Sequence, residues 1–183
     1  MSRIDVADMD GVRVAHTNFS TDSRGVFFKY HPDELLQSRL GSVAISINST
    51  IGTIRGIHFQ VEPYAEEKIV SCIQGSILEV IVDLRPGSKS LGKIATFKLE
   101  QSSAKQVYLP KGIAHGFQTL QSDTIVQYFL TSEYSPHHSY AINPFGQLGV
   151  DWPIRDFLVS EKDAGGISLS LAQSKYAESI LSE

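Results

Sequence analysis

The sequence has only one cysteine, Cys72, in 183 residues, which excludes an internal disulfide and a zinc site built from several thiolates. It has no run of lysines and arginines, and its formal net charge is -4, so binding to the phosphates of a nucleic acid is not expected. No apolar run is long enough to span a bilayer, and residues 1–10 lack the apolar stretch of a secretory signal. These absences predict a cytoplasmic protein without a membrane or nucleic-acid partner.

The rest of the composition is that of an ordinary globular chain, with 42% hydrophobic and 20% charged residues, which argues against disorder. No low-complexity segment or linker divides the chain, so we expect one domain over residues 1–183. Cys72 lies in the apolar run 69–73. We therefore expect its thiol to fill the core and not to act as a nucleophile.

Short β-type segments follow one another through most of the chain, separated by turns rich in Gly, Pro and Ser. We expect strands at residues 12–20, 26–28, 42–49, 52–60, 67–73, 76–84, 93–99, 106–109, 116–120 and 124–131. Residues 31–36 look like a helix start, and residues 170–181 have helical spacing. This pattern predicts a β-sandwich or jelly roll, and it does not fit alternating strands and helices.

Two of these segments contain a histidine, one within an expected strand and one just after an expected turn. Residues 54–60 hold Arg55 and His58, and residues 109–117 contain a Pro-x-Gly turn that leads into His115. A single half-buried histidine usually forms a hydrogen bond with the backbone. Two histidines on barrel strands near Arg55 and Lys68 instead favour a proton-transfer site in which both imidazoles face inward.

A metal site is not favoured by the same residues. Barrels of this type often hold a metal with a His-x-His pair, a glutamate and a further histidine. Here His58 is followed two residues later by Gln60, which leaves Glu66 or Glu67 and His115 as ligands. This set falls short of the usual three strong protein ligands, so we expect no metal.

Three further residues each allow two interpretations. Lys68 is either a surface lysine at a strand start or a cation that points into the barrel and stabilises an oxyanion. Tyr128 is either a core residue or a general acid. Asp83 ends an apolar strand and needs a partner, which could be Arg85 or His115.

Read in order, the motifs of the chain resemble the dTDP-4-dehydrorhamnose 3,5-epimerase family of nucleotide-sugar epimerases. The resemblance covers nearly the whole chain, through residues 22–28, 54–60, 68, 74–76, 82–88, 91–93, 110–117, 148–153 and 160–163. It implies an all-β cupin fold, a jelly-roll (double-stranded β-helix) barrel with short C-terminal helices. It also implies an isomerase that needs neither a metal nor any other cofactor.

The resemblance assigns the catalytic roles to four residues. His58 would be the general base, held by the carboxylate of Asp163. Lys68 would stabilise the enolate oxygen, and Tyr128 would be the acid on the opposite face of the sugar. Nothing but the resemblance singles out Asp163, which otherwise looks like a helix-capping or loop residue.

It also assigns substrate-binding residues. Arg55 and Asn48 match positions that contact the nucleotide diphosphate, and Lys162 takes a place where some members use arginine for that contact. His115, with Asp83 nearby, would line the same pocket.

Three more residues, Arg24, Phe27 and Tyr134, match positions that shape the nucleotide and sugar site. Arg24 and Phe27 would reach the site of the other subunit, so the resemblance implies a homodimer.

The implied reaction is epimerisation at C3 and/or C5 of a nucleotide-linked 4-keto-6-deoxyhexose, with dTDP as the expected nucleotide. Its setting would be deoxysugar biosynthesis of the dTDP-rhamnose and O-antigen lipopolysaccharide type. The chain departs from the family pattern at Lys29, usually acidic, at Ser46, usually Gln, and in a shortened segment 48–58. These departures leave open the nucleotide, the sugar and the number of inverted centres. A related nucleotide-sugar ketoisomerase and a non-catalytic sugar-binding cupin are the alternatives.

Overall fold

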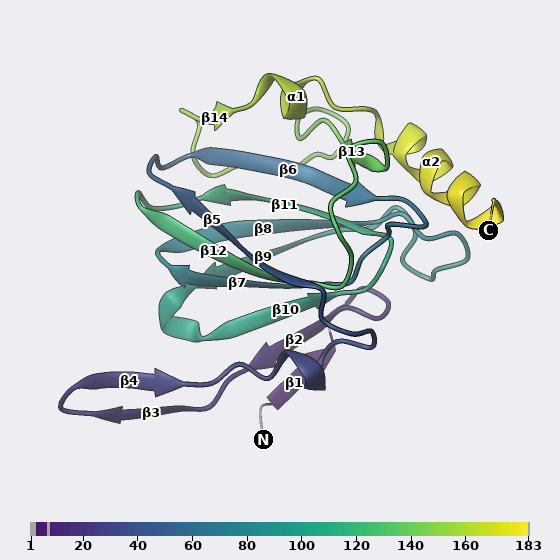
Figure 1. Ribbon diagram of the computed structural model, residues 1–183. Coiled ribbons are helices and arrows are strands. Elements are labelled where there is room, and N and C mark those ends of the chain that lie inside the picture. The colour runs from purple at the N-terminus through teal and green to yellow at the C-terminus, as the bar shows by residue number, and fades with distance from the viewer. Residues whose placement is uncertain (1–2, 7, 183) are drawn as a thin grey trace.

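Two β-sheets face each other in the computed structural model, which describes residues 3–6 and 8–182 (Figure 1). The first sheet has the order β1 (Arg3–Val6), β2 (Arg13–His16), β10 (Lys105–Leu109), β7 (Lys68–Gln74), β12 (Thr124–Leu130), β5 (Ser42–Asn48). The second has the order β13 (Ser139–Ala141), β6 (Thr53–Gln60), β11 (Ile113–Thr119), β8 (Ser76–Asp83), β9 (Ile94–Glu100), and β14 (Leu158–Val159) pairs with β6 in parallel.

The remaining elements lie outside these two sheets. β3 (Phe19–Asp22) and β4 (Gly25–Phe28) form a hairpin that projects away from the barrel (Figure 1). In the described part of the chain, the helices are two short 3-10 turns, Pro32–Glu34 and Gln101–Ser103, and the α-helices α1 (Glu161–Ala164) and α2 (Leu169–Leu181). No helix within residues 3–6 and 8–182 is long and apolar enough to cross a membrane.

The chain crosses between the two sheets repeatedly. β5 and β6 lie in different sheets, as do β7 and β8, β9 and β10, and β11 and β12. This crossing pattern closes the sheets into a jelly roll. The predicted all-β cupin barrel with short C-terminal helices is therefore confirmed.

The space between the sheets is filled at its core by apolar side chains from both of them. Val70 and Val126 come from the first sheet, and Ile81 and Phe117 from the second. Cys72 is buried in the same cluster, as expected, and burial raises the pKa of its thiol to about 11. The thiol is therefore protonated at neutral pH and unsuited to nucleophilic attack.

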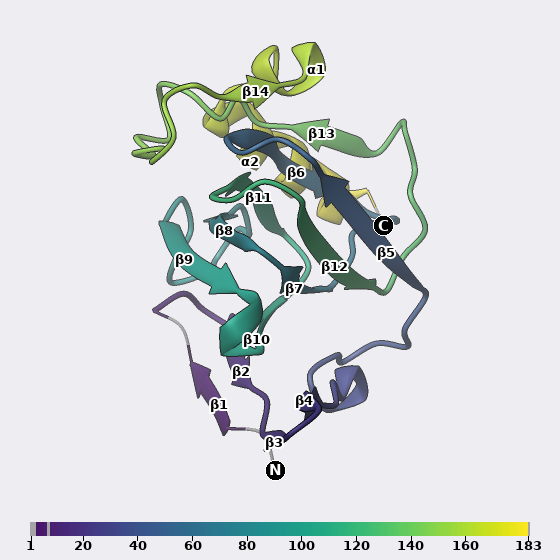
Figure 2. The ribbon, with the colours of Figure 1, turned by 90° about the vertical axis from the view of Figure 1, so that its left-hand side faces the viewer.

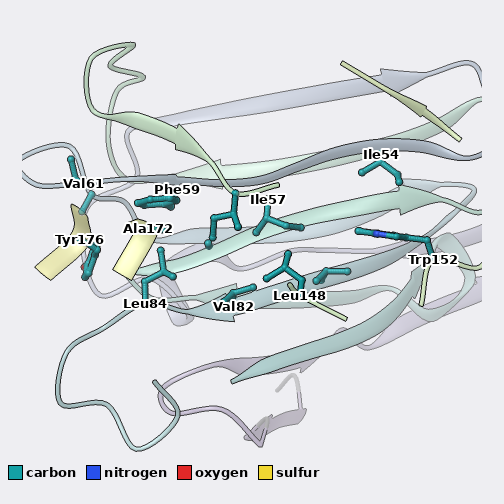
Figure 3. Close-up of a cluster of buried hydrophobic side chains, with 14 residues drawn as sticks. Ile54, Ile57, Phe59, Val61, Val82, Leu84, Leu148, Trp152, Ala172 and Tyr176 are labelled. Atoms are coloured by element: carbon teal, nitrogen blue, oxygen red, sulfur yellow. The ribbon is translucent and has the colours of Figure 1, made fainter. Parts of the chain in front are cut away.

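A second cluster lies on the outer face of the second sheet, where the C-terminal part of the chain covers it (Figure 3). Ile57 and Phe59 of β6 belong to the cluster together with Trp152 and with Tyr176 of α2. Burying an aliphatic or aromatic side chain of this size contributes about 1.5–3 kcal/mol. The packing therefore fixes the C-terminal segment against β6. β13 and β14 pair with β6 in the sheet, and α1 lies next to β14 (Figure 2).

The observed strands follow the predicted ones closely from residue 42 to residue 131. The predicted strand 12–20 is instead two strands, β2 and β3, separated by Thr17 and Asn18. The predicted helix start at 31–36 is a single 3-10 turn, Pro32–Glu34. The alternation of apolar and polar residues did not predict the strands β1, β13 and β14. Those three strands have four residues or fewer, too few for a period to stand out.

Candidate active site

A cavity of about 510 Å³ opens between the two sheets of the barrel. Its lining includes the sequence-predicted residues Arg55, His58, Lys68, His115, Tyr128, Tyr134 and Lys162. Three of these, His58, Lys68 and Tyr128, are predicted catalytic residues, and they come from β6, β7 and β12. The two sheets therefore present candidate catalytic groups to one shared space.

The motif in β6 reaches the cavity through an irregularity in its pairing with β11. His58 lies opposite His115, but Arg55 lies opposite Phe117, so β6 has one extra residue between them. In a regular strand, side chains three positions apart point to opposite faces. The bulge places both Arg55 and His58 on the cavity side.

Gly56 makes this bulge feasible. Its φ is +105°, and a Cβ at this position would lie 2.7 Å from the carbonyl oxygen of His115. A larger residue would therefore be strained by its backbone conformation and would collide with β11. This explains the glycine between Arg55 and His58 in physical terms.

His58 is held by Asp163, a residue 105 positions later in the chain. His58 Nε2 lies 2.7 Å from Asp163 Oδ1, and the backbone N–H of Gly56 donates to Asp163 Oδ2 at 3.1 Å. Asp163 reaches this place because β14 pairs with β6 and α1 follows at once, with Ser160 as its N-cap. The structure therefore brings together the pair that the resemblance implied.

The protonation of this pair follows from its contacts. Burial raises the pKa of Asp163, but the hydrogen bonds from His58 and Gly56 outweigh it, and the net pKa lies below the ordinary value. An ionised carboxylate can only accept, so Nε2–H of His58 donates to it. The lone pair is then on Nδ1, and 38% of the His58 side chain is exposed. This imidazole can take a proton from a ligand in the cavity.

Lys68 is not a surface lysine. Its side chain lines the cavity, is only 10% exposed, and pairs through Nζ with Glu66 Oε1 at 2.9 Å. As the first residue of β7, it lies in the sheet opposite the one that carries His58. Of the two interpretations left open by the sequence, the structure supports a cation that points into the barrel.

His115 forms a buried pair with Glu79, a residue that sequence reasoning missed. Nδ1 of His115 lies 2.8 Å from Glu79 Oε1. Burial raises the pKa of Glu79 well above its ordinary value, against a smaller opposing effect of Lys68. Burial, Lys68 and His58 together hold the pKa of His115 well below its ordinary value. Both shifts favour the uncharged form of the group, and in those forms the Glu79 carboxyl donates to Nδ1.

The predicted contact of Asp83 with His115 is wrong. Asp83 and Glu79 each lie two positions from Ile81, which opposes His115 in the β8–β11 register, but the carboxyl that binds His115 is that of Glu79. Burial raises the pKa of Asp83, but hydrogen bonds from Arg85 and from the hydroxyls of residues 88 and 90 outweigh it and lower the net pKa. Asp83 is therefore the buried partner of Arg85 and does not line the cavity.

Tyr128 lies on β12, in the sheet opposite His58. Its half-buried ring meets the ring of His115 edge-on, with centroids 5.8 Å apart. Burial is the main cause, and Glu79 a further one, of a pKa raised far above the ordinary value of a phenol. The Tyr128 hydroxyl therefore keeps its proton at neutral pH and can donate it.

Arg55 and Asn48 are joined in the structure. Arg55 Nε donates to Asn48 Oδ1 at 2.7 Å, and Asn48 Nδ2 donates to the carbonyl of Thr124 at 3.1 Å. Asn48 is buried and does not line the cavity, so it orients the guanidinium. Lys162 of α1 and the exposed Tyr134 line the same cavity.

Arg24 and Phe27 lie away from the cavity of their own chain. Both are on the projecting β3–β4 hairpin, where Arg24 pairs with Asp22 at 2.7 Å and Phe27 is 64% exposed. Within one chain, the structure does not bring these two predicted residues to the other site residues.

The cavity offers a metal ion few ligands. Across the described part of the chain, no group of three or more His, Cys, Asp or Glu side chains is close enough to bind a metal. Gln60, in the place of the missing second histidine, uses its side chain to bind the backbone of Tyr64, Glu133 and Ser135.

A jelly roll whose cavity holds a carboxylate-bound histidine, a lysine and a neutral phenol defines a cupin of the acid–base enzyme class. The family model described as dTDP-4-dehydrorhamnose 3,5-epimerase matches residues 7–170, and the chain belongs to this family. This confirms the predicted resemblance and the predicted enzyme class, an epimerase.

Individual relatives agree with this assignment. The chain is 36% identical over 155 residues to a dTDP-4-dehydrorhamnose 3,5-epimerase of Sinorhizobium fredii, which covers 81% of this chain and 80% of the relative. It is similar to the crystal structure of a 4-keto-6-deoxy sugar epimerase from the novobiocin cluster of Streptomyces spheroides, with a TM-score of 0.88, 31% identity and coverage of 95% and 90%.

A third relative has a bound ligand. It is a dTDP-6-deoxy-D-glucose-3,5-epimerase from Legionella pneumophila in complex with dTDP-4-keto-L-rhamnose. The TM-score is 0.87 at 28% identity, and the match covers 93% of this chain and 94% of that one.

Proposed function

We propose that this chain epimerises C3 and/or C5 of a dTDP-linked 4-keto-6-deoxyhexose. A proton is removed from a carbon next to the ketone and returned on the opposite face of the sugar. One observation carries the proposal: His58 and Tyr128 line the same cavity from opposite sheets. A base and an acid on opposite sides of a ring are what inversion requires.

His58 is the base. The C–H bond beside a ketone is a weak acid, so the base must be free, oriented and close to the sugar. Asp163 holds Nε2 and thereby leaves the Nδ1 lone pair for the proton. As His58 becomes a cation, the same carboxylate stabilises it.

Lys68 stabilises the enolate that forms when the proton leaves. Its ammonium lines the cavity and the side chain is itself largely buried, so its charge acts more strongly than it would in bulk solvent. The neutral imidazole of His115, with its Nδ1 occupied by Glu79, offers Nε2–H as a second donor.

Tyr128 returns a proton to the carbon on the other face. A raised pKa keeps the phenol protonated until the enolate is present. Transfer is then favourable, because a phenol is a far stronger acid than the C–H bond that forms. His58 later releases its proton to solvent, and the phenolate is reprotonated, so no proton is gained or lost overall.

The diphosphate binds to the cationic end of the cavity. Arg55 donates to the neutral amide of Asn48, so its charge is available to a phosphate. Lys162 lines the same cavity from α1 and adds a second positive charge. Tyr134, which is 64% exposed at the cavity, adds an aromatic surface for the nucleoside.

The active assembly is a homodimer of single-domain chains in which the β3–β4 hairpin of one subunit reaches the other site. Exposed apolar side chains on the hairpin and on the edge strand β5 support this assembly, namely Phe19, Val26, Phe27, Val43, Ile45 and Ile47. Such a surface is typical of a subunit interface. A monomer in light scattering at micromolar concentration would contradict it.

Proton exchange tests the function. The chain is incubated in D₂O with dTDP-4-keto-6-deoxyhexose, and NMR follows deuterium at C3 and C5 and the configuration of each centre. We expect deuterium uptake together with inversion. A ketone that moves along the ring would indicate a ketoisomerase instead, and binding without exchange would indicate a sugar-binding cupin.

A further inference from the structure

Glu66 adds a carboxylate to the cavity that no step above uses. It lies in the connection between β6 and β7, two residues before Lys68, and both side chains line the cavity. Their side chains are 8% and 10% exposed, and Oε1 lies 2.9 Å from Lys68 Nζ. At that depth an ion pair is only weakly screened by solvent.

The neighbouring carboxyl groups do not serve Lys68 in the same way. Glu67 accepts hydrogen bonds from the backbone of Gln37 and the hydroxyl of Ser38, at 2.8 and 2.7 Å. Glu79 of β8 is close enough to Lys68 for the two charges to interact, but burial raises the pKa of its carboxyl and favours the protonated form. Neither carboxyl forms an ion pair with Lys68 among the described residues, as Glu66 does.

The other titratable groups that line the cavity do not pair with Lys68 within the described residues. Burial favours the uncharged forms of His115 of β11 and Tyr128 of β12, and His58 of β6 is already paired with Asp163. Glu133 also lines the cavity, but Glu66 is the carboxylate within ion-pair distance of Lys68 among the described residues.

We propose that Glu66 is a positioning residue: it fixes the Lys68 ammonium at the cavity wall and keeps it charged for the enolate oxygen. This inference rests on the role proposed above for Lys68. A lone ammonium in a buried site loses its proton more easily than a paired one. An uncharged amine would then face the enolate, and the barrier would rise.

The test uses the variant Glu66→Gln, which keeps the shape of the side chain and removes its negative charge. In a plot of kcat for deuterium exchange against pH, kcat falls at high pH, and we call this fall the basic limb. We expect the basic limb of Glu66→Gln to lie at lower pH than that of the wild type. At the wild-type optimum kcat falls about tenfold, which is less than the ~10²–10³ expected when an oxyanion donor is lost. KM changes by no more than about threefold, because the enolate and not the ground state carries the charge. dTDP alone binds as before.

Two further variants isolate the effect. Glu66→Asp keeps a carboxylate, so its basic limb should lie between those of the wild type and Glu66→Gln. Glu62 lies in the same connection but outside the cavity, and it pairs with Lys111 of the turn between β10 and β11, so Glu62→Gln removes a comparable ion pair. Its profile should match the wild type.

A basic limb in Glu66→Gln identical to that of Glu62→Gln would overturn the inference. If Lys68→Met still loses exchange, the proposed function stands and only the role of Glu66 is wrong. If Lys68→Met keeps wild-type exchange, the role of Lys68 is wrong and the role of Glu66 with it. Should Glu66→Gln fail to fold, the Glu66→Asp profile decides: an unmoved limb contradicts the proposal.

Discussion

At the scale of single residues, similar contacts give different protonation states. Three basic side chains of the cavity each contact one carboxyl group: His58–Asp163 at 2.7 Å, Lys68–Glu66 at 2.9 Å and His115–Glu79 at 2.8 Å. Asp163 also accepts a backbone N–H, and its pKa falls. Oε2 of Glu79 has no hydrogen-bond partner among the described residues, and its pKa rises. The contacts of the first pair thus favour an ionised carboxylate beside His58, and those of the His115–Glu79 pair favour the uncharged forms.

The raised pKa of Glu79 predicts a specific pH dependence of stability. Its folded pKa lies above the unfolded value of 4.5, so its contribution is present below pH 4.5 and is lost as pH rises toward the folded pKa. Glu79→Gln keeps a donor for His115 and removes this dependence. We expect the variant to gain stability relative to the wild type as pH rises above 4.5, by about 1.4 kcal/mol per pH unit until the folded pKa is reached.

Urea denaturation at pH 5, 6, 7 and 8 measures this effect. The free energy of unfolding of the wild type, minus that of Glu79→Gln, should become more negative as pH rises through this range. If Glu79→Gln is less stable and the difference is independent of pH, Glu79 is ionised and the assignment is wrong.

The sequence allowed some of these residues to be predicted but not their partners. His58 and His115 stand out because a histidine in an apolar strand is unusual, and Lys68 and Tyr128 gained their roles from the resemblance. Glu79 gave one signal, a carboxylate inside the apolar strand 76–83, but Asp83 at the end of that strand gave the same signal. Only the side-chain contacts separate the two: Glu79 binds His115, whereas Asp83 binds Arg85.

At the scale of elements, the bulge in β6 decides where the site residues point. Gly56→Ala would place a Cβ 2.7 Å from the His115 carbonyl oxygen in a backbone conformation that alanine adopts poorly. We expect a loss of roughly 2–4 kcal/mol in the free energy of unfolding, made up of strain and collision. In the folded fraction, exchange activity should fall by about 10²-fold, because His58 is displaced.

Gly87→Ala is the matched control. Gly87 also has a positive φ, +77°, but a Cβ there meets nothing within 4 Å. It should lose only about 1–2 kcal/mol and keep full activity. Equal losses of activity in the two variants would show that the bulge does not orient the site.

The strands of the barrel were predictable and the closure of the site was not. Periodicity over five to eight residues identified β5 to β12. The contact of Asp163 with His58 depends instead on β14, a two-residue strand, and on the apolar cover over β6. Neither leaves a local pattern, so only the resemblance pointed to Asp163.

At the scale of the whole molecule, the proposed dimer makes each site depend on both chains. Arg24→Ala removes a hairpin residue, and His58→Ala removes a base, so each variant alone should be inactive or nearly so. In a mixed dimer, one site combines an intact His58 with an intact hairpin from the other chain. Random mixing of equal amounts should therefore restore about a quarter of the wild-type sites.

The measurement is exchange activity after the two variants are unfolded together and refolded, with separately refolded samples as the control. Recovery only in the joint sample supports hairpin exchange between subunits. No recovery, with dimers present in light scattering, would show that Arg24 does not act on the site of its partner.

The central claim is that His58 and Tyr128 act on opposite faces of the sugar, and one measurement tests it most directly. Tyr128→Phe is incubated with dTDP-4-keto-6-deoxyhexose in D₂O, and NMR reports exchange and inversion separately. His58 still forms the enolate and can return a deuteron to the face it came from. Exchange should therefore persist while inversion slows by about 10²–10⁴-fold, and His58→Ala should lose both. An equal loss of exchange and inversion in Tyr128→Phe would contradict the account.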